Sequence, residues 1–140
     1  MIRYGFVGLG QLGAALAGRL AGAGFGLAVH DLSRDLADPL LAAGADWADG
    51  PADLAARVDH VVTCLPSPAA SEAVLRAMLP AMRDGATWIE CSTLGRDDVL
   101  RLAALAEGQG VRMLECPVTG GVHLAARGEV TVLVGGDADL

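Results

Sequence analysis

The chain has 140 residues, which is enough for one domain with a hydrophobic core, and its net charge is −7 at pH 7. All ten basic residues are scattered arginines, so no basic stripe is present that would neutralise a nucleic-acid backbone. No apolar run approaches the roughly 20 residues needed to cross a bilayer, and the first residues lack the pattern of a signal peptide. We therefore expect a cytoplasmic protein with no nucleic-acid or membrane partner.

Strand-like and helix-like segments alternate along the whole chain. Strands are predicted at residues 2–8, 26–31, 45–48, 59–65, 86–91, 111–116 and 129–134. Helices are predicted at residues 11–22, 35–43, 51–57, from about 68 to 82 and 96–108, and a loop is predicted at Thr119–Gly121. Almost wholly apolar strands indicate a sheet that is buried on both faces. We expect an α/β fold of Rossmann type over residues 1–140, with a doubly wound, mainly parallel sheet and helices on both faces.

A glycine motif joins the first predicted strand to the first predicted helix. Gly8-Leu9-Gly10-Gln11-Leu12-Gly13 matches the G-x-G-x-x-G pattern of dinucleotide-binding turns. In a chain with 19 glycines this spacing is weak by itself, but the strand before it and the helix after it support the match. Gly8 would permit the tight turn, Gly10 the approach of a pyrophosphate, and Gly13 close packing of the helix. The free N–H groups at the helix start would hold the anion. The alternative is a glycine-rich turn that binds nothing.

Asp31 ends the second predicted strand, 18 residues after Gly13. An acid at this place can accept hydrogen bonds from ribose hydroxyls, and its charge would repel a 2′-phosphate, so NAD is predicted in preference to NADP. Arg34 follows three residues later and would weaken that preference. The alternative role for Asp31 is that of a helix N-cap, for which Ser33 is the competing residue.

Three cysteines, Cys64, Cys91 and Cys116, each end an apolar run. Their odd number and the absence of a short paired spacing do not indicate a disulfide framework or a zinc motif. The pattern predicts small buried side chains at strand ends. The alternative is a trio that lines one crevice and binds a metal ion.

Residues 5–20, GFVGLGQLGAALAGRL, resemble the opening of the β-hydroxyacid dehydrogenases, the family that includes 3-hydroxyisobutyrate dehydrogenase, tartronate semialdehyde reductase and 6-phosphogluconate dehydrogenase. Four later segments resemble that family in the expected order, namely Cys64-Leu65-Pro66-Ser67, Glu90-Cys91-Ser92-Thr93, Cys116-Pro117-Val118-Thr119-Gly120-Gly121 and Glu129 to Gly136. The resemblance covers essentially the whole chain.

The resemblance implies a role for each matched position. The cofactor would be bound by Gly8, Leu9, Gly10, Gln11, Leu12, Gly13, Asp31, Leu65, Pro66 and Thr93. The carboxylate and hydroxyl of a small hydroxy acid would be bound by Ser92, Thr119, Gly120 and Gly121. Thr119 stands where the family usually has Ser; it can make the same hydrogen bonds, but its methyl group narrows the site. No metal ligand is implied.

Two departures from the family matter. Gly95-Arg96 stands where a proline usually follows the Ser-Thr pair. In the family, a lysine beyond the cofactor domain acts as general acid/base, and this chain has no lysine. No catalytic residue is therefore assigned within the chain. His123 could do acid/base work near neutral pH, the alternative being an ordinary loop residue.

We expect the NAD-binding domain of an oxidoreductase that transfers a hydride between a nicotinamide cofactor and a small 3-hydroxy acid. The family's C-terminal helical domain would lie outside residues 1–140, so we expect this chain alone to bind NAD with little or no turnover. We also expect it to associate with that domain or as a homo-oligomer. The alternative is a non-catalytic nucleotide-binding or assembly module, or an isolated fragment. A relative of the imine reductases would share the glycine turn but does not predict the Thr119-Gly120-Gly121 segment.

Overall fold

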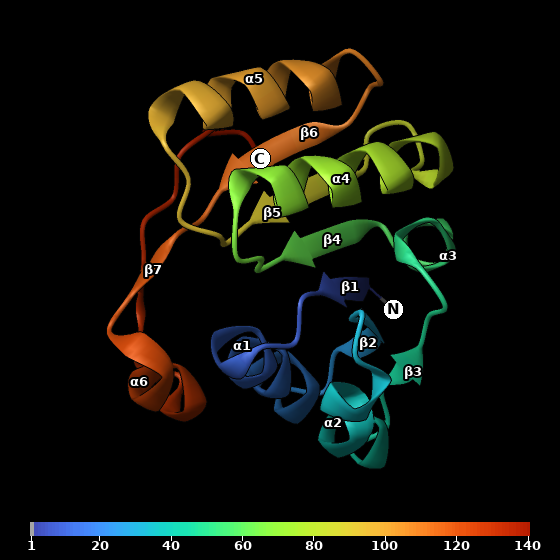
Figure 1. The fold of residues 1–140 in the computed structure, drawn as a ribbon, viewed down its shortest axis with the longest axis vertical. Helices are drawn as coiled ribbons and strands as arrows, with labels where there is room; N and C mark the ends of the chain where they lie inside the picture. The colour runs from blue at the N-terminus through green and yellow to red at the C-terminus, as the bar shows by residue number, and fades with distance from the viewer. Residues whose placement is uncertain (1) are drawn as a thin grey trace.

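A six-stranded parallel sheet forms the centre of the protein (Figure 1). The structure, a computed structural model, describes residues 2–140. The strands lie in the order β3-β2-β1-β4-β5-β6, and every neighbouring pair is parallel. Their bounds are β1 (Arg3–Val7), β2 (Gly26–His30), β3 (Asp46–Trp47), β4 (His60–Thr63), β5 (Thr87–Glu90) and β6 (Arg112–Glu115). This order and direction confirm the predicted Rossmann-type α/β fold.

Helices cover both faces of the sheet (Figure 1). One face carries α1 (Gln11–Gly22), α2 (Asp38–Ala42) and α6 (Gly121–Arg127), and the other carries α3 (Pro51–Ala56), α4 (Pro68–Met78) and α5 (Arg96–Glu107). Each face has its own core, built around Phe6 and Val29 on the α1 side and around Trp88 and Leu54 on the α4 side. Among residues 2–140, no helix combines the length and apolar character needed to span a membrane.

Local signals explain where the helices begin and change. Ser67 caps α4, its hydroxyl accepting a hydrogen bond from the Ala70 N–H at 3.1 Å, and Pro68 follows in the first turn, where its missing N–H is no loss. The helix expected to run to residue 82 instead passes into a 3-10 helix, η2 (Leu79–Ala81), because Pro80 cannot donate to the preceding turn. The helix expected at 35–43 is likewise divided into η1 (Arg34–Ala37) and α2.

The chain after β6 differs from its prediction. Two short strands, β7 (Val118–Thr119) and β8 (Thr131–Val132), pair antiparallel with each other outside the main sheet. The strand predicted at 129–134 is therefore shorter than expected, and it lies outside the parallel sheet. The segment expected to be only a loop contains Thr119 in β7 and Gly121 at the start of α6. Glycines explain the change, because Gly120 (φ 114°) reverses the chain before α6 and Gly128 (φ 73°) ends it.

An apolar groove remains on the α1 side of the sheet, with a volume of about 400 Å³. Its walls come from α1, from the middle strands and from the antiparallel pair β7–β8. They include Phe6, Leu20, Phe25, Val62 and Ile89. The helices on this side therefore leave part of the sheet uncovered.

We expect Gly5→Ala to lower the free energy of unfolding by about 1–3 kcal/mol, because it would overpack the core. A Cβ atom at Gly5 would overlap the buried Leu54 side chain and lie 3.1 Å from Val58 Cγ2. The matched control is Gly18→Ala in α1, where nothing lies within 4 Å and alanine is expected to add about 0.5–1 kcal/mol. Urea denaturation followed by circular dichroism measures both changes. Equal stability of Gly5→Ala and the wild type would contradict the packing described.

Candidate functional site

The glycine turn joins β1 to α1 at the carboxyl edge of the sheet. Gly8 has φ of 96°, and a Cβ atom there would overlap the carbonyl oxygen of Cys64 beside it. Gly13 packs so closely that a Cβ atom would overlap the carbonyl oxygen of Gly8. Both contacts agree with the predicted tight turn and close helix packing. They bring the start of α1 directly onto the edge of the sheet.

Free amide groups lie beside open space at the start of α1. The N-cap is Gly10, no side chain in the described part of the chain caps it, and Ala14 N–H makes the first intrahelical hydrogen bond, to Gly10 at 2.8 Å. The N–H groups of Gln11, Leu12 and Gly13 consequently have no acceptor within the helix. A Cβ atom at Gly10 would meet nothing within 4 Å. An uncapped helix start beside open backbone suits an anion, so these residues fit a pyrophosphate group.

Asp31, which follows β2, holds two backbone amides. Its Oδ2 accepts a hydrogen bond from Leu9 N–H in the glycine turn at 2.7 Å, and its Oδ1 accepts one from Ser33 N–H at 2.8 Å. The carboxylate therefore ties the turn after β1 to the segment after β2. Each oxygen keeps a further lone pair that can accept a ribose hydroxyl. Ser33, rather than Asp31, occupies the N-cap position of η1, and its hydroxyl makes no capping bond.

Ser92 connects the loops that follow β4 and β5. Its Oγ accepts a hydrogen bond from Leu65 N–H at 2.7 Å, and its own N–H donates to Glu90 Oε1 at 2.7 Å. Ser92 is only 4% exposed, whereas its neighbour Thr93 and the nearby Pro66 are exposed. Ser92 thus has a structural contact that the sequence did not indicate. Its contact with substrate stays a prediction.

Glu90, the last residue of β5, is completely buried. Its Oε1 is bonded to Ser92, and its Oε2 has no hydrogen-bond partner among residues 2–140. Glu115 of β6 is its register partner, so two acidic side chains lie next to each other on one face. The side-chain hydrogen bond of Glu90 holds the loop that carries Ser92 and Thr93. An acidic residue within an apolar strand was the sequence signal that could have drawn attention to it.

The three cysteines lie at the ends of three neighbouring strands, as predicted, and all are free. Burial, with a smaller contribution from the Glu90 charge, raises the pKa of Cys64 to about 11. Burial, with neighbouring Cys116 and Cys64, raises the pKa of Cys91 to about 12. The pKa of Cys116 is raised by burial and by the charge of Glu115. Within residues 2–140, no group of three His, Cys, Asp or Glu side chains is placed to hold a metal ion.

The Thr119-Gly120-Gly121 segment connects β7 to α6 beyond the same edge of the sheet (Figure 1). All three residues are exposed, and Gly121 has φ of 73°. His123, in the first turn of α6, is exposed as well. Because α6 packs against α1, the segment is anchored on the helix that follows the glycine turn. Its backbone and the Thr119 hydroxyl are open to a ligand.

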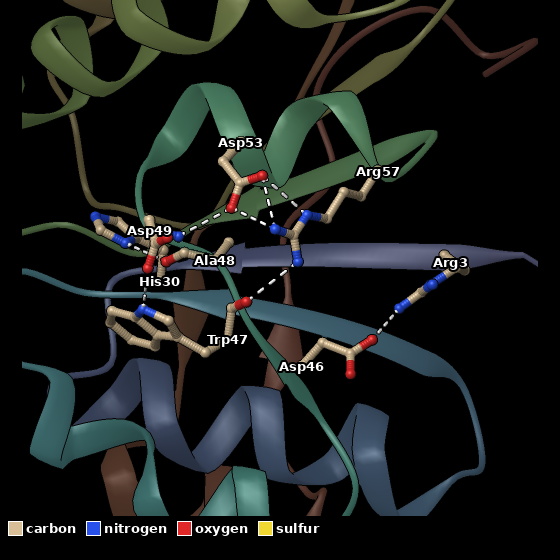
Figure 2. A network of polar contacts seen from close by, with 8 residues as sticks. All are labelled: Arg3, His30, Asp46, Trp47, Ala48, Asp49, Asp53 and Arg57. Atoms are coloured by element: carbon tan, nitrogen blue, oxygen red, sulfur yellow. Dashed lines mark hydrogen bonds and ion pairs between the residues drawn. The ribbon is translucent and has the colours of Figure 1, made fainter.

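The structure therefore gathers the glycine turn, Asp31, Leu65–Pro66 and Ser92–Thr93 at one edge of the sheet. The sequence did not indicate Trp47, which ends β3 at this edge. Its ring lies 5.3 Å from the His30 ring and beneath the Arg34 guanidinium (5.4 Å), and Figure 2 shows its polar neighbours.

Residues 3–140 match the sequence family described as the NAD binding domain of 6-phosphogluconate dehydrogenase. The chain is 37% identical to the NAD-dependent L-serine dehydrogenase of Pseudomonas aeruginosa and 34% identical to the mitochondrial 3-hydroxyisobutyrate dehydrogenase of Rattus norvegicus. The structure of Mycobacterium tuberculosis 3-hydroxyisobutyrate dehydrogenase with L-serine superposes with a TM-score of 0.95 at 32% identity. These matches cover 99%, 94% and 99% of this chain, but only 48%, 40% and 48% of the respective relatives. The chain thus spans about half the length of the proteins it resembles.

We expect Ser92→Ala to lower the free energy of unfolding by about 1–3 kcal/mol, because the Leu65 N–H would lose its acceptor in a partly buried position. The matched control is Thr93→Ala, which removes an exposed hydroxyl from the next residue and should change stability by less than about 0.5 kcal/mol. Denaturant unfolding of both variants is the measurement. If Ser92→Ala lowers the free energy of unfolding no more than its control does, the hydrogen bond to Leu65 does not stabilise the fold.

At pH 7 the three thiols are expected to react slowly with iodoacetamide in the folded chain, because the thiolate is the reactive form. With the pKa of Cys64 raised to about 11, its labelling rate should rise about tenfold per pH unit between pH 7 and 9. Mass spectrometry of the intact chain follows the reaction, and the urea-unfolded chain is the control. Native labelling at pH 7 that is as fast as that of the unfolded chain would contradict this expectation.

Proposed function

This chain belongs to the family of the NAD binding domain of 6-phosphogluconate dehydrogenase, and we propose that it is the cofactor-binding part of an NAD-dependent dehydrogenase of small 3-hydroxy acids. The observation that carries the proposal is the open space at Gly10 beside the uncapped amides of α1, with Asp31 bonded to the same turn. The named relatives support the substrate class, because 3-hydroxyisobutyrate and L-serine are both carboxylic acids with a hydroxyl on carbon 3.

In this proposal the segment from Gly8 to Gly13 holds the pyrophosphate through its backbone, because Gly10 presents no side chain. Asp31 accepts hydrogen bonds from the ribose hydroxyls while it keeps its two backbone contacts. Its negative charge disfavours the 2′-phosphate of NADP. The next residue, Leu32, is 100% exposed and uncharged, so it offers no compensating cation. These features favour NAD over NADP.

At the other end of the site, the exposed Pro66 and Thr93 and the half-buried Leu65 would line the path of the cofactor. Bound nicotinamide supplies the hydride acceptor. The Thr119 hydroxyl and the amides of Gly120 and Gly121 would bind the carboxylate and hydroxyl of the substrate. Ser92 still has a hydroxyl proton to donate, because its bond with Leu65 uses the oxygen as acceptor.

The substrate hydroxyl also needs a group that takes its proton. The chain has no lysine, and His123 is the titratable group nearest in sequence to the proposed substrate segment. Since the relatives are about twice as long, we propose that this group belongs to a further domain, which packs on the apolar groove of the α1 face. The chain alone then binds the dinucleotide without turning over hydroxy acids. The lack of lysine equally favours a second candidate, a nucleotide-binding module with no reaction of its own.

We expect saturable NADH binding to the wild-type chain, tighter than that of NADPH, and a dissociation constant roughly tenfold higher for Gly10→Ala, about 1.4 kcal/mol. The added methyl group would occupy the space proposed for the pyrophosphate. It touches no atom of the protein within 4 Å, so the melting temperature should stay unchanged. Fluorescence titration and thermal melting are the two measurements.

Gly18→Ala, on the same helix but far from the turn, is the matched control and should bind NADH like the wild type. A wild-type chain that shows no saturable binding would overturn the proposed cofactor site. Equal binding by Gly10→Ala would overturn the proposed place of the pyrophosphate. Oxidation of 3-hydroxy acids by the chain alone would contradict the proposal that proton transfer lies elsewhere.

A further inference from the structure

Arg34 and Trp47 form a pair next to the proposed ribose site that the proposed function does not use. The guanidinium carbon of Arg34 lies 5.4 Å from the centroid of the Trp47 ring, a cation–π arrangement. Arg34 is the first residue of η1 and comes three residues after Asp31. Trp47 ends β3 and is the register partner of Val29 in β2. The pair therefore links the segment after β2 to the edge strand beside it.

Hydrogen bonds and ring packing hold Trp47 in place (Figure 2). Its indole N–H donates to Asp49 Oδ1 at 3.0 Å, and its carbonyl oxygen accepts from Arg57 at 3.2 Å. The His30 ring packs 5.3 Å from the indole ring. Trp47 is thus held at its indole N–H, at its carbonyl oxygen and by the neighbouring His30 ring, which fixes the position of the ring that faces Arg34.

The residues around Trp47 are themselves bonded to one another (Figure 2). Asp53 accepts hydrogen bonds from Arg57 at 2.6 Å and from Asp49 N–H at 3.0 Å, and these contacts lower the pKa of Asp53. His30 Nδ1 lies 2.9 Å from the carbonyl oxygen of Ala48. Asp53 therefore stays charged and paired with Arg57 at neutral pH.

Arg34 is the arginine closest in sequence to Asp31, because no other arginine lies between Arg19 and Arg57. In the described part of the chain it forms no ion pair, so no carboxylate neutralises its charge. Its guanidinium lies over the ring of Trp47 instead. Its guanidinium is therefore available to an anion that comes close enough.

The two side chains turn toward opposite sides of β2. Asp31 bonds to Leu9 in the turn after β1, whereas Arg34 lies over Trp47 of β3, and β2 stands between β1 and β3 in the sheet. Among residues 2–140, no cation pairs with Asp31 on the side where its carboxylate meets the glycine turn.

We propose that Trp47 determines the preference for NAD over NADP by holding Arg34 away from Asp31. This inference rests on the proposed dinucleotide site. NAD places a hydroxyl at the ribose 2′ position, which Asp31 can accept, whereas NADP places a phosphate there, which needs a cation. An Arg34 released from the ring would supply that cation through charge-assisted hydrogen bonds.

The test compares dissociation constants for NADH and NADPH, measured by fluorescence titration of the whole 140-residue chain. Trp47→Leu removes the aromatic face, and the affinity for NADPH relative to NADH should rise about two- to fivefold, the worth of an exposed cation–π contact. Trp47→Phe keeps a weaker aromatic face and should show a smaller rise in the same direction. Melting temperatures establish that each variant is folded, and the phenylalanine variant decides the matter where the leucine variant does not fold.

The second arm of the test removes the cation. Arg34→Gln alone should leave the affinity for NADPH relative to NADH within about twofold of the wild-type value. Combined with Trp47→Leu, it should cancel the rise in relative NADPH affinity that Trp47→Leu causes. The matched control is Arg83→Gln, which removes one positive charge at the opposite edge of the sheet, where Arg83 pairs with Asp59, and should not change the ratio.

Each outcome decides between the proposals. The inference is overturned if the affinity for NADPH relative to NADH stays unchanged or falls in the Trp47 variants, or if its rise persists without Arg34. In either case, NADH binding by the wild type preserves the proposed function. A wild-type chain that binds neither dinucleotide overturns both.

Discussion

The close approach of α1 to the sheet is the constraint on which the rest of the site depends. At Gly13 the helix backbone lies directly against the carbonyl group of Gly8, with no room for a side chain between them. Because of this contact the end of the helix, rather than its side, faces the edge where the parallel strands open. The protein carries a net charge of −7, so its overall field repels an anion. The amides and the dipole at the start of α1 must therefore provide the local attraction.

Side chains at this edge hold one another's loops in place through hydrogen bonds within the protein. Asp31 holds the amide of Leu9, and Ser92 holds the amide of Leu65, in each case across to the turn after a neighbouring strand. Glu90 holds Ser92 in turn. Loops that are already ordered lose little further entropy on binding, which favours affinity. This arrangement costs stability, because Glu90 is completely buried and its Oε2 has no hydrogen-bond partner among residues 2–140.

Much of the fold could be predicted from the sequence, because apolar strands and glycine turns are local signals. The alternation of strand-like and helix-like segments predicted the sheet and its flanking helices. The departure of β8 from the sheet could not be predicted, because it depends on how the chain turns at Gly120 and on pairing with β7. At the site, the glycine motif and Asp31 could be identified from the sequence. The burial of Ser92 and the contacts around Trp47 could not be predicted, because they depend on segments that are distant in the sequence.

The chemistry of the groups at the start of α1 determines which signals could affect dinucleotide binding. The groups proposed to meet the phosphates are backbone amides, which carry no titratable proton and no amine that could be acetylated or methylated. A change of pH within the physiological range, or an enzyme that modifies lysines, would leave this end of the site as it is. Control over dinucleotide binding would then have to act through the strand-end loops, where Asp31 and Arg34 carry the local charges.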